Sequence, residues 1–296
     1  MQRFKNILFT PFTEEGAESA LRRAHELADR NHASLTVFGT VPEPPRLARM
    51  LQRTAGPTPD ALADQLRQEL TDLAATAGAP GSARIDVAVG VPFITIIERV
   101  FADGHDLVVI TDDGPDSPTA STTKHLLRKC PCPVWVMRPK GAPGHRVLAA
   151  VDPEPDDPAE MNRLILDLAS SHAELNDAEL HVAHAWSVYG ATTLRTSPFL
   201  RTSGGEFDDL RQVTRDGHLG RLEETVNAHG LGGLDHEVHL VEGDPGDVIP
   251  YLADQLDITL LVMGTVGRTG VPGLIMGSHA ERILDPCALL ERERIR

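Results

Sequence analysis

The order of apolar segments repeats once along the 296-residue chain, and this repetition restricts the fold more than any other feature of the sequence. Short apolar runs of the first half have counterparts in the second half, in the same order, which is the signature of an internal repeat. The pairs are 5–12 with 145–152, 33–41 with 178–186, 87–97 with 238–249, and 106–114 with 259–267. An internal duplication is the simplest account of this order.

Helical patterns separate the apolar runs. Residues 14–31 place apolar side chains at helical spacing, and residues 58–78 begin with Thr58 as a candidate N-cap. Residues 158–172 and 206–229 have the same character. Strands that alternate with helices predict parallel sheets with right-handed crossovers. We therefore expect an α/β protein made of two tandem, five-stranded, Rossmann-like parallel-sheet domains.

The segment 138–145 interrupts the pattern with proline and glycine and marks the boundary between the halves. We expect one domain over residues 1–140 and a second over 145–296. The connection is short, so we expect the two domains to pair within one chain, and a homodimer is left open. A second long connection, 187–205, is rich in Ser, Thr and Gly and is either a functional lid or a disordered loop.

Composition and charge exclude several classes of function. The net charge of −15, with no basic run, disfavours binding to nucleic acid and to anionic membrane surfaces. No stretch approaches the roughly 18 apolar residues of a membrane span, and the first residues lack the apolar core of a signal peptide. Three cysteines give no disulfide framework. We expect a cytoplasmic protein.

A glycine-rich loop is the strongest functional signal. Residues 263–281, MGTVGRTGVPGLIMGSHAE, follow an apolar run and precede a helical pattern. The spacing is Gly264-x2-Gly267-x9-Gly277-Ser278. In open α/β sheets ligands bind beyond the carboxyl ends of the strands, and a helix start offers free N–H groups to phosphate. The loop is neither a Walker A loop nor a dinucleotide fingerprint, and a glycine-rich turn without a ligand is the alternative.

With this spacing in this context, the chain resembles tandem-type universal stress proteins over essentially its whole length. The resemblance implies that the second domain binds ATP, with or without Mg2+, through the glycine pattern. It also implies that Asp152, at the end of the domain's first strand, contacts the base region. With the flanking positions, the expected nucleotide site comprises Ala150, Asp152, His184, Ala185, Met263, Gly264, Gly267, Arg268, Gly277, Ser278 and His279.

The first half lacks these features, and we expect it to have lost nucleotide binding. The differences are Phe12 for Asp152, Thr111 for Gly264 and Ala120 for Gly277. The intervening loop is shorter and carries Asp112, Asp113 and Asp116, which would repel a triphosphate unless a divalent cation intervened. These carboxylates are either a hard-metal site or, as we favour, a solvated acidic loop.

Other residue groups give weaker signals. Cys130 and Cys132 lack the two-residue gap usual in redox or metal pairs, so we expect no chemistry from them. His181 and His184 lie three apart on a predicted strand and face opposite sides, which disfavours a shared metal, although His184 can face the nucleotide site. We assign no catalytic residue and no metal ligand. After Leu284 the sequence departs from the family pattern, as either divergence or a sequence artefact.

Three functions are consistent with these features. The leading hypothesis is an ATP-binding regulatory protein of the stress response that signals through unknown protein partners. The second is an interaction scaffold of the same fold that binds no nucleotide. The third is a slow ATPase, in which Arg268 lies near the terminal phosphate, although no general base is identifiable.

Overall fold

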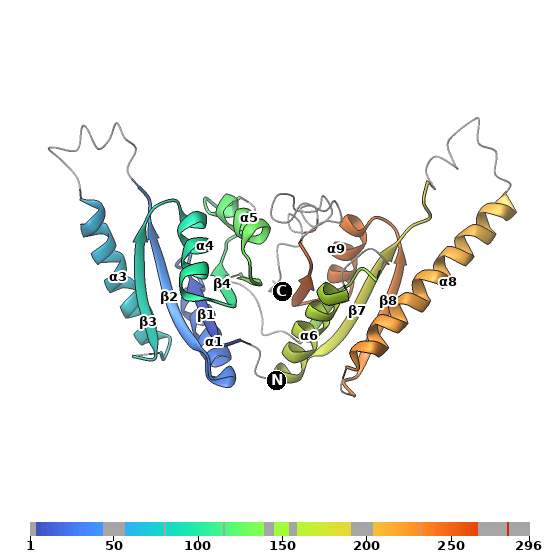
Figure 1. Ribbon diagram of the computed structural model, residues 1–296, viewed down its shortest axis with the longest axis horizontal. Coiled ribbons are helices and arrows are strands. Elements are labelled where there is room, and N and C mark those ends of the chain that lie inside the picture. The colour runs from blue at the N-terminus through green and yellow to red at the C-terminus, as the bar shows by residue number, and fades with distance from the viewer. Residues whose placement is uncertain are drawn as a thin grey trace, which may run out of the picture. The chain divides into compact units, whose positions relative to one another are not determined.

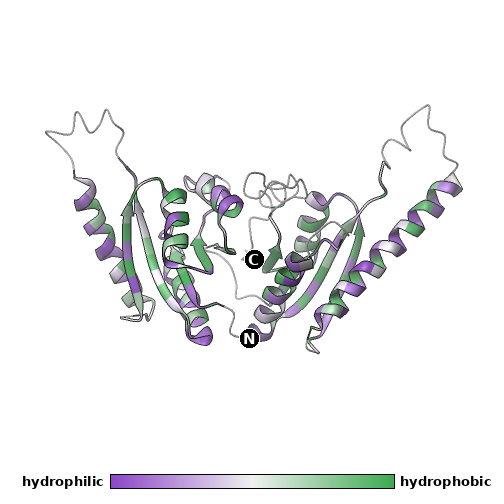
Figure 2. Ribbon diagram, viewed as in Figure 1, coloured by the Kyte–Doolittle hydropathy of each residue, from purple (hydrophilic) through white to green (hydrophobic). Residues whose placement is uncertain are grey.

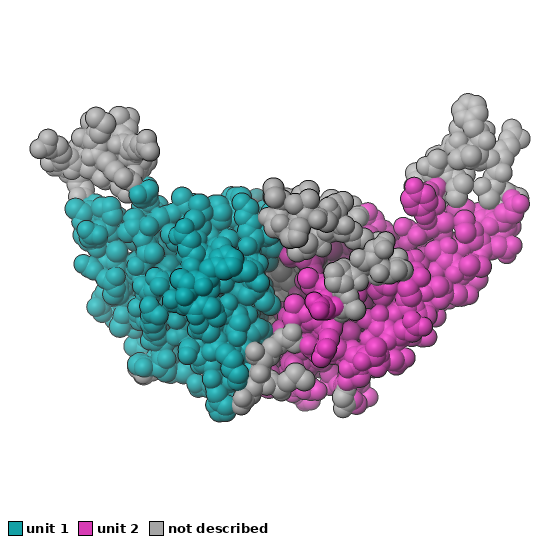
Figure 3. Space-filling view, in the orientation of Figure 1, with its two compact units in different colours: residues 1–141 teal, residues 142–296 magenta. Residues whose placement is uncertain are grey.

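The computed structural model describes residues 4–43, 57–79, 81–114, 116–138, 145–153, 159–190, 204–231, 233–265 and 283. The chain forms two compact units, Met1–Gly141 and Ala142–Arg296, which Figure 3 colours teal and magenta. None of the described helices combines the length and the apolar character needed to cross a membrane. Each unit is a parallel sheet with helices packed on it (Figure 1).

The first unit contains a five-stranded parallel sheet in the order β3-β2-β1-β4-β5. Its strands are β1 (Asn6–Thr10), β2 (Ser34–Val41), β3 (Ala83–Val89), β4 (Leu107–Thr111) and β5 (Val134–Met137). Its helices are α1 (Ala17–Asn31), α3 (Pro59–Thr76), α4 (Pro92–Asp103) and α5 (Ala120–Lys129). The central strands are almost continuously apolar because helices cover both faces of the sheet.

Helix ends in the first unit follow the local sequence. The side chain of Thr58 accepts a hydrogen bond from the Ala61 amide at 3.2 Å, and Pro59 occupies the first turn of α3. Helices α1 and α3 pack their apolar faces on one side of the sheet, against Ile7, Phe9 and Val37 among others. In Figure 2 the strands are largely green, and the helices carry purple on part of their surface.

The second unit repeats this plan with a four-stranded parallel sheet in the order β8-β7-β6-β9. Its strands are β6 (Arg146–Ala150), β7 (Glu179–Trp186), β8 (His236–Glu242) and β9 (Leu260–Met263). Its helices are α6 (Ala159–Asn176), α8 (Gly204–His229) and α9 (Pro245–Gln255). One apolar cluster joins α6 and α8 to the sheet, and a second joins α9 to it.

The second sheet has four strands where five were expected. Residues beyond Thr265, apart from Ile283, lie outside the described part of the chain, so the segment that would supply a fifth strand lies there too. Ile283 is buried against the α9 cluster. The long connection predicted over 187–205 is described only to Gly190, after which α8 begins at Gly204, two residues before the predicted helix.

The strand register fixes which residues of the two units are equivalent. In the first unit Thr10 pairs with Ile110, and in the second unit Ala150 pairs with Met263. Two residues beyond the first pair stands Phe12, and two residues beyond the second stands Asp152. By the same register Thr111, the last residue of β4, is equivalent to Gly264, the residue after β9. The duplication can therefore be compared residue by residue at the edge where ligands of this fold class bind.

Candidate functional site

The carboxyl ends of β6 and β9 lie side by side at the point where the chain reverses its order of adding strands. Ala150 ends β6 directly beside Met263, which ends β9. Asp152 and Gly264 follow these strands, so four of the predicted site residues lie at one edge of the sheet. Parallel strands produce this convergence because their carboxyl ends meet at the same edge.

Asn162 of α6 holds the backbone of Asp152 at both polar groups. The Asp152 amide donates to Oδ1 of Asn162 at 2.9 Å, and Nδ2 of Asn162 donates to the Asp152 carbonyl at 2.8 Å. Asn162 is 4% exposed, whereas the Asp152 side chain is 39% exposed. The clamp therefore fixes the main chain inside the protein and leaves the carboxylate accessible at the edge of the sheet.

His184 lies beneath this turn and has both ring nitrogens engaged within the protein. Its Nδ1 is 3.3 Å from the carbonyl oxygen of Val151 and 3.9 Å from Oδ1 of Asp152. Because a carbonyl only accepts, Nδ1 carries the hydrogen, and Nε2 accepts from Nδ1 of His218 at 2.9 Å. The His218 ring in turn packs against Trp186. His184 thus supports the Asp152 turn from below.

Three of the predicted site residues are apolar and form what we call the apolar floor of the site: Ala150, Ala185 and Met263. All three are partly buried and pack against the cluster of apolar side chains centred on α9. Ala185 is the residue after His184 on β7, so its side chain projects to the opposite face of the sheet. The predicted site residues on β7 therefore lie on different faces.

Gly264 is a position where a side chain would enter the edge of the sheet. A Cβ atom built there would lie 3.4 Å from Cγ and 3.6 Å from Sδ of Met161, which is close to ordinary contact. The backbone of Gly264 is not in the left-handed region. A larger residue is therefore compatible with the fold, and glycine at this position leaves space. Gly267, Arg268, Gly277, Ser278 and His279 lie outside the described residues.

At the equivalent edge of the first unit, one side chain forms hydrogen bonds with the nearby backbone. Oγ1 of Thr111 accepts hydrogen bonds from the amides of Phe12 at 2.9 Å and Thr13 at 3.3 Å. The Thr111 side chain therefore fills the position that Gly264 leaves empty in the second unit. The equivalent backbone donors are no more available there, because the Asp152 amide donates to Asn162 and Pro153 has no N–H.

The acidic loop of the first unit differs in part from the expected solvated loop. Asp112 is 4% exposed, and its Oδ1 accepts from the hydroxyl of Ser117 at 3.0 Å and that of Thr119 at 3.4 Å. Asp113 and Asp116 are exposed, as a solvated loop requires. Asp112 is buried because two hydroxyl donors replace its hydration, and it serves as an internal acceptor.

Sequence reasoning missed Asn162 and His218. Both are polar residues inside long helical patterns, and their partners lie 10 and 34 residues away in sequence. No local pattern indicates that these two side chains, and not their exposed polar neighbours, point inward. The available signal would have been their position on the otherwise apolar faces of α6 and α8.

Comparison with known proteins agrees with this architecture. The model of the universal stress protein family matches residues 3–138 and again residues 144–289. The chain belongs to the universal stress protein family. Universal stress protein E of Escherichia coli K12 is 32% identical over 204 residues, a match that covers 66% of this chain and 62% of that protein's length. Its relative in Photorhabdus laumondii is 24% identical over 305 residues, covering 96% of this chain and 93% of that protein.

A solved structure extends the likeness over both units. The functionally unknown protein PA1789 from Pseudomonas aeruginosa PAO1 is similar with a TM-score of 0.61 and 26% sequence identity. The alignment covers 96% of this chain and 90% of that one. The tandem arrangement of two α/β universal stress protein units is therefore shared along the length of the chain.

Proposed function

We propose that the second unit binds ATP, accompanied by Mg2+, at the carboxyl edge of β6 and β9. In this proposal the Asp152 carboxylate accepts a hydrogen bond from the base or ribose, and Gly264 admits the nucleotide close to the main chain. Gly267, Arg268, Gly277, Ser278 and His279 then supply the phosphate contacts. The apolar floor of Ala150, Ala185 and Met263 lies beneath the base, and His184 supports the turn.

A single observation carries the proposal. The two units have the same strand register, but the side chains at the carboxyl edges of their sheets differ in type. In the first unit a threonine hydroxyl covers two backbone amides, and in the second unit glycine stands at that position. In the second unit the residue equivalent to Phe12 is an accessible aspartate whose backbone a buried asparagine fixes. An edge closed by a threonine side chain in one copy and left open by glycine in the other supports one nucleotide site per chain.

The function that follows is regulation rather than catalysis. We propose that the protein acts in the cytoplasm as a nucleotide-responsive member of its family, in the stress response, through protein partners that recognise the second unit. Pairing of the units, or of two copies, belongs to the same proposal. A side chain suited to activate water at the terminal phosphate is not among the described residues that we place at this edge, so slow hydrolysis ranks third, after the scaffold function.

Isothermal titration of the nucleotide-free chain with Mg-ATP tests the proposal. We expect one site per chain, with an affinity near micromolar, which corresponds to about 8 kcal/mol. Asp152→Ala should weaken binding by about 1–2 kcal/mol, or about 5–30-fold in Kd, because it removes one hydrogen bond. Asp113→Ala removes an exposed carboxylate from the loop after β4 in the first unit and should leave Kd unchanged.

Two results would contradict the proposal. Absence of binding at millimolar ATP by a folded, nucleotide-free sample would favour the scaffold function. Two equivalent sites would show that the closed edge of the first unit does not prevent binding. Phosphate release by the wild type above that of Asp152→Ala would instead assign slow ATPase activity to the same site.

A further inference from the structure

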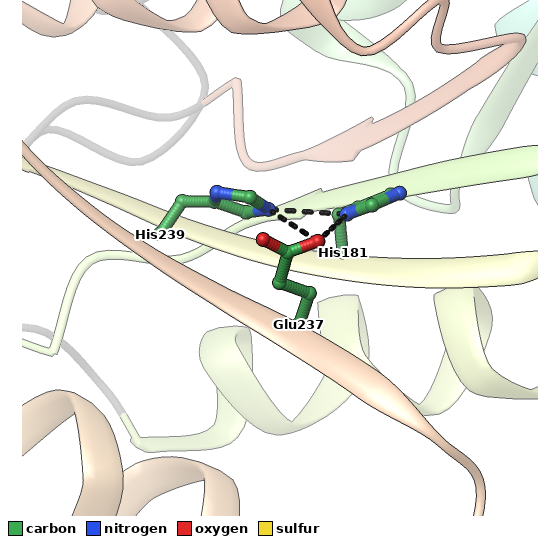
Figure 4. A group of neighbouring side chains, drawn as sticks. All are labelled: His181, Glu237 and His239. Carbon is green, nitrogen blue, oxygen red and sulfur yellow. Dashed lines mark hydrogen bonds and ion pairs between the residues drawn. The ribbon is translucent and has the colours of Figure 1, made fainter.

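Two histidines and a glutamate form a cluster on β7 and β8, in the part of the sheet away from the proposed nucleotide site. His181 pairs with Glu237 in the strand register, and His239 lies two residues further along β8. The three side chains are therefore on one face of the sheet, and Figure 4 shows them pointing toward one another. It is the face on which α9 packs, because Ala183, two residues after His181, belongs to the α9 cluster.

The spacing of the ligand atoms fits a small divalent cation. Nδ1 of His181 lies 3.1 Å from Nε2 of His239 and 3.6 Å from Oε2 of Glu237, and the remaining pair is 4.0 Å apart. Two ligands bound tetrahedrally to zinc at about 2.0–2.1 Å are about 3.3 Å from each other. Shifts of a few tenths of an ångström would bring the three atoms to coordinating distances.

The surroundings of His181 hold its ring in place for a metal. His181 is 6% exposed, and its Nδ1 faces His239 and Glu237. A neutral imidazole keeps a lone pair for a cation. With Nδ1 toward the cluster, Nε2 carries the hydrogen. This atom is buried, has no hydrogen-bond partner among the described residues, and lies 4.0 Å from Oε2 of Glu179. A carboxylate that accepts a hydrogen bond from a ligating histidine is the usual supporting arrangement, and Glu179 would have to approach Nε2 by about 1 Å to provide it.

The first unit supplies an internal comparison at the same positions. By register, Thr36 is equivalent to His181, Arg84 to Glu237, and Asp86 to His239. There the α4 residue Arg99 places its guanidinium 2.7 Å from the Asp86 carboxylate. Counted from the proline that begins each helix, the α9 residue equivalent to Arg99 is Leu252. The first unit thus places the Arg99 guanidinium at this position. In the second unit a leucine replaces the arginine, and the facing strands carry residue types that bind metals.

We propose that His181, Glu237 and His239 bind one divalent cation of the zinc class. Two imidazoles and a carboxylate suit zinc better than the hard cations calcium and magnesium, which take oxygen ligands. The three side chains leave one coordination position to water. Because the ligands come from two neighbouring strands, the bound ion joins β8, the edge strand of the described sheet, to β7. The site is separate from the nucleotide edge and does not depend on ATP binding.

Zinc titration of the metal-stripped full-length chain, in competition with a chromogenic chelator, tests this proposal. The wild type should bind zinc at this site. Glu237→Gln should weaken the binding at least about tenfold, because loss of even an outer-shell partner lowers metal affinity about 10–100-fold. His239→Ala should weaken it further. His236→Gln is the matched control, because His236 lies on the same strand, is exposed, and bonds to the Leu234 carbonyl; its affinity should equal that of the wild type.

Thermal unfolding provides a readout that is specific to the folded site. Zinc should raise the Tm of the wild type and of His236→Gln, because a ligand that binds only the folded state stabilises it. The same addition should leave the Tm of Glu237→Gln nearly unchanged. Glu237 is largely exposed, so this variant keeps its fold even if His239→Ala does not. With Co2+ as a probe, the absence of thiolate charge-transfer absorption excludes the cysteines as ligands.

Two outcomes would overturn the proposal. One is a zinc affinity that Glu237→Gln leaves unchanged, since the metal would then bind elsewhere. The other is a wild-type Tm that does not respond to zinc, since the three side chains would then be only a hydrogen-bonded cluster.

Discussion

Replacing Asn162 by alanine removes the clamp on Asp152 without touching the nucleotide edge directly. Asn162 is buried and makes two hydrogen bonds to the Asp152 backbone, at 2.9 and 2.8 Å. Each such bond contributes about 0.5–1.5 kcal/mol net, so the free energy of unfolding of the second unit should fall by about 1–3 kcal/mol. The loss should reach the upper end if water cannot replace the side chain.

Urea denaturation can report on the second unit alone. The chain has two tryptophans, Trp135 in β5 of the first unit and Trp186 at the end of β7. In a Trp135→Phe background the fluorescence comes from Trp186, which packs beside the His184–His218 pair under the Asp152 turn. Asn176→Ala is the control on the same helix, because it loses one exposed hydrogen bond and should cost at most about 0.5 kcal/mol.

Nucleotide titration then tests whether Asn162 positions Asp152 for ATP or only stabilises the second unit. If Asn162 acts on ATP through Asp152, Asn162→Ala should raise Kd in the wild-type background and change it little in the Asp152→Ala background. Additive effects of the two substitutions on Kd would refute the positioning role. An unfolding free energy equal to that of Asn176→Ala would refute the energetic contribution of the clamp.

Three further predictions test other parts of the structure. Gly264→Thr should lower ATP affinity about tenfold or more in a titration, because its side chain blocks one hydrogen bond to a charged group. Stability should change little, because the added Cβ lies at ordinary contact distances, 3.4 Å from Met161 and 3.8 Å from Ile165. Thr111→Gly should destabilise the first unit by about 1–3 kcal/mol in urea, because the Phe12 amide loses its acceptor; a loss below about 0.5 kcal/mol would contradict this role of Thr111. Burial lowers the pKa of His105, so the unfolded state binds its proton more readily and stability should decrease as pH falls below about 6.5. His105→Gln should flatten that decrease between pH 7 and 5, and an unchanged slope would contradict it.

The architecture was predictable because it depends on patterns that repeat locally. Runs such as Ile7–Thr10 and Leu107–Thr111 are buried on both faces, and only a parallel sheet covered on both sides requires this. The alternation of strand and helix then restricts the topology to right-handed crossovers. The universal stress protein family and the α/β fold are both confirmed. Within the described residues the second sheet has four strands, and the segment expected to supply the fifth lies outside them.

Contacts between distant polar residues were not predictable in the same way. The alternation of side chains along a strand correctly predicts that His181 and His184 lie on opposite faces of β7. The actual partner of His181 is His239, 58 residues away, and the contact depends on the register between β7 and β8. A shift of that register by one residue would turn His239 to the other face. Local periodicity identifies the strands but does not determine their register.

Duplication makes these long-range contacts interpretable, because each unit is a control for the other. At the carboxyl edge of the first unit, the Thr111 hydroxyl accepts a hydrogen bond from the Phe12 amide. At the equivalent position of the second unit, Gly264 leaves space. Further down the same sheets, Arg99 neutralises Asp86 in the first unit, whereas His181 and His239 face each other in the second. At these two positions the first unit pairs its polar groups with its own side chains, whereas the second unit presents groups that an external ligand can contact. We therefore expect ligand-dependent stabilisation to be confined to the second unit.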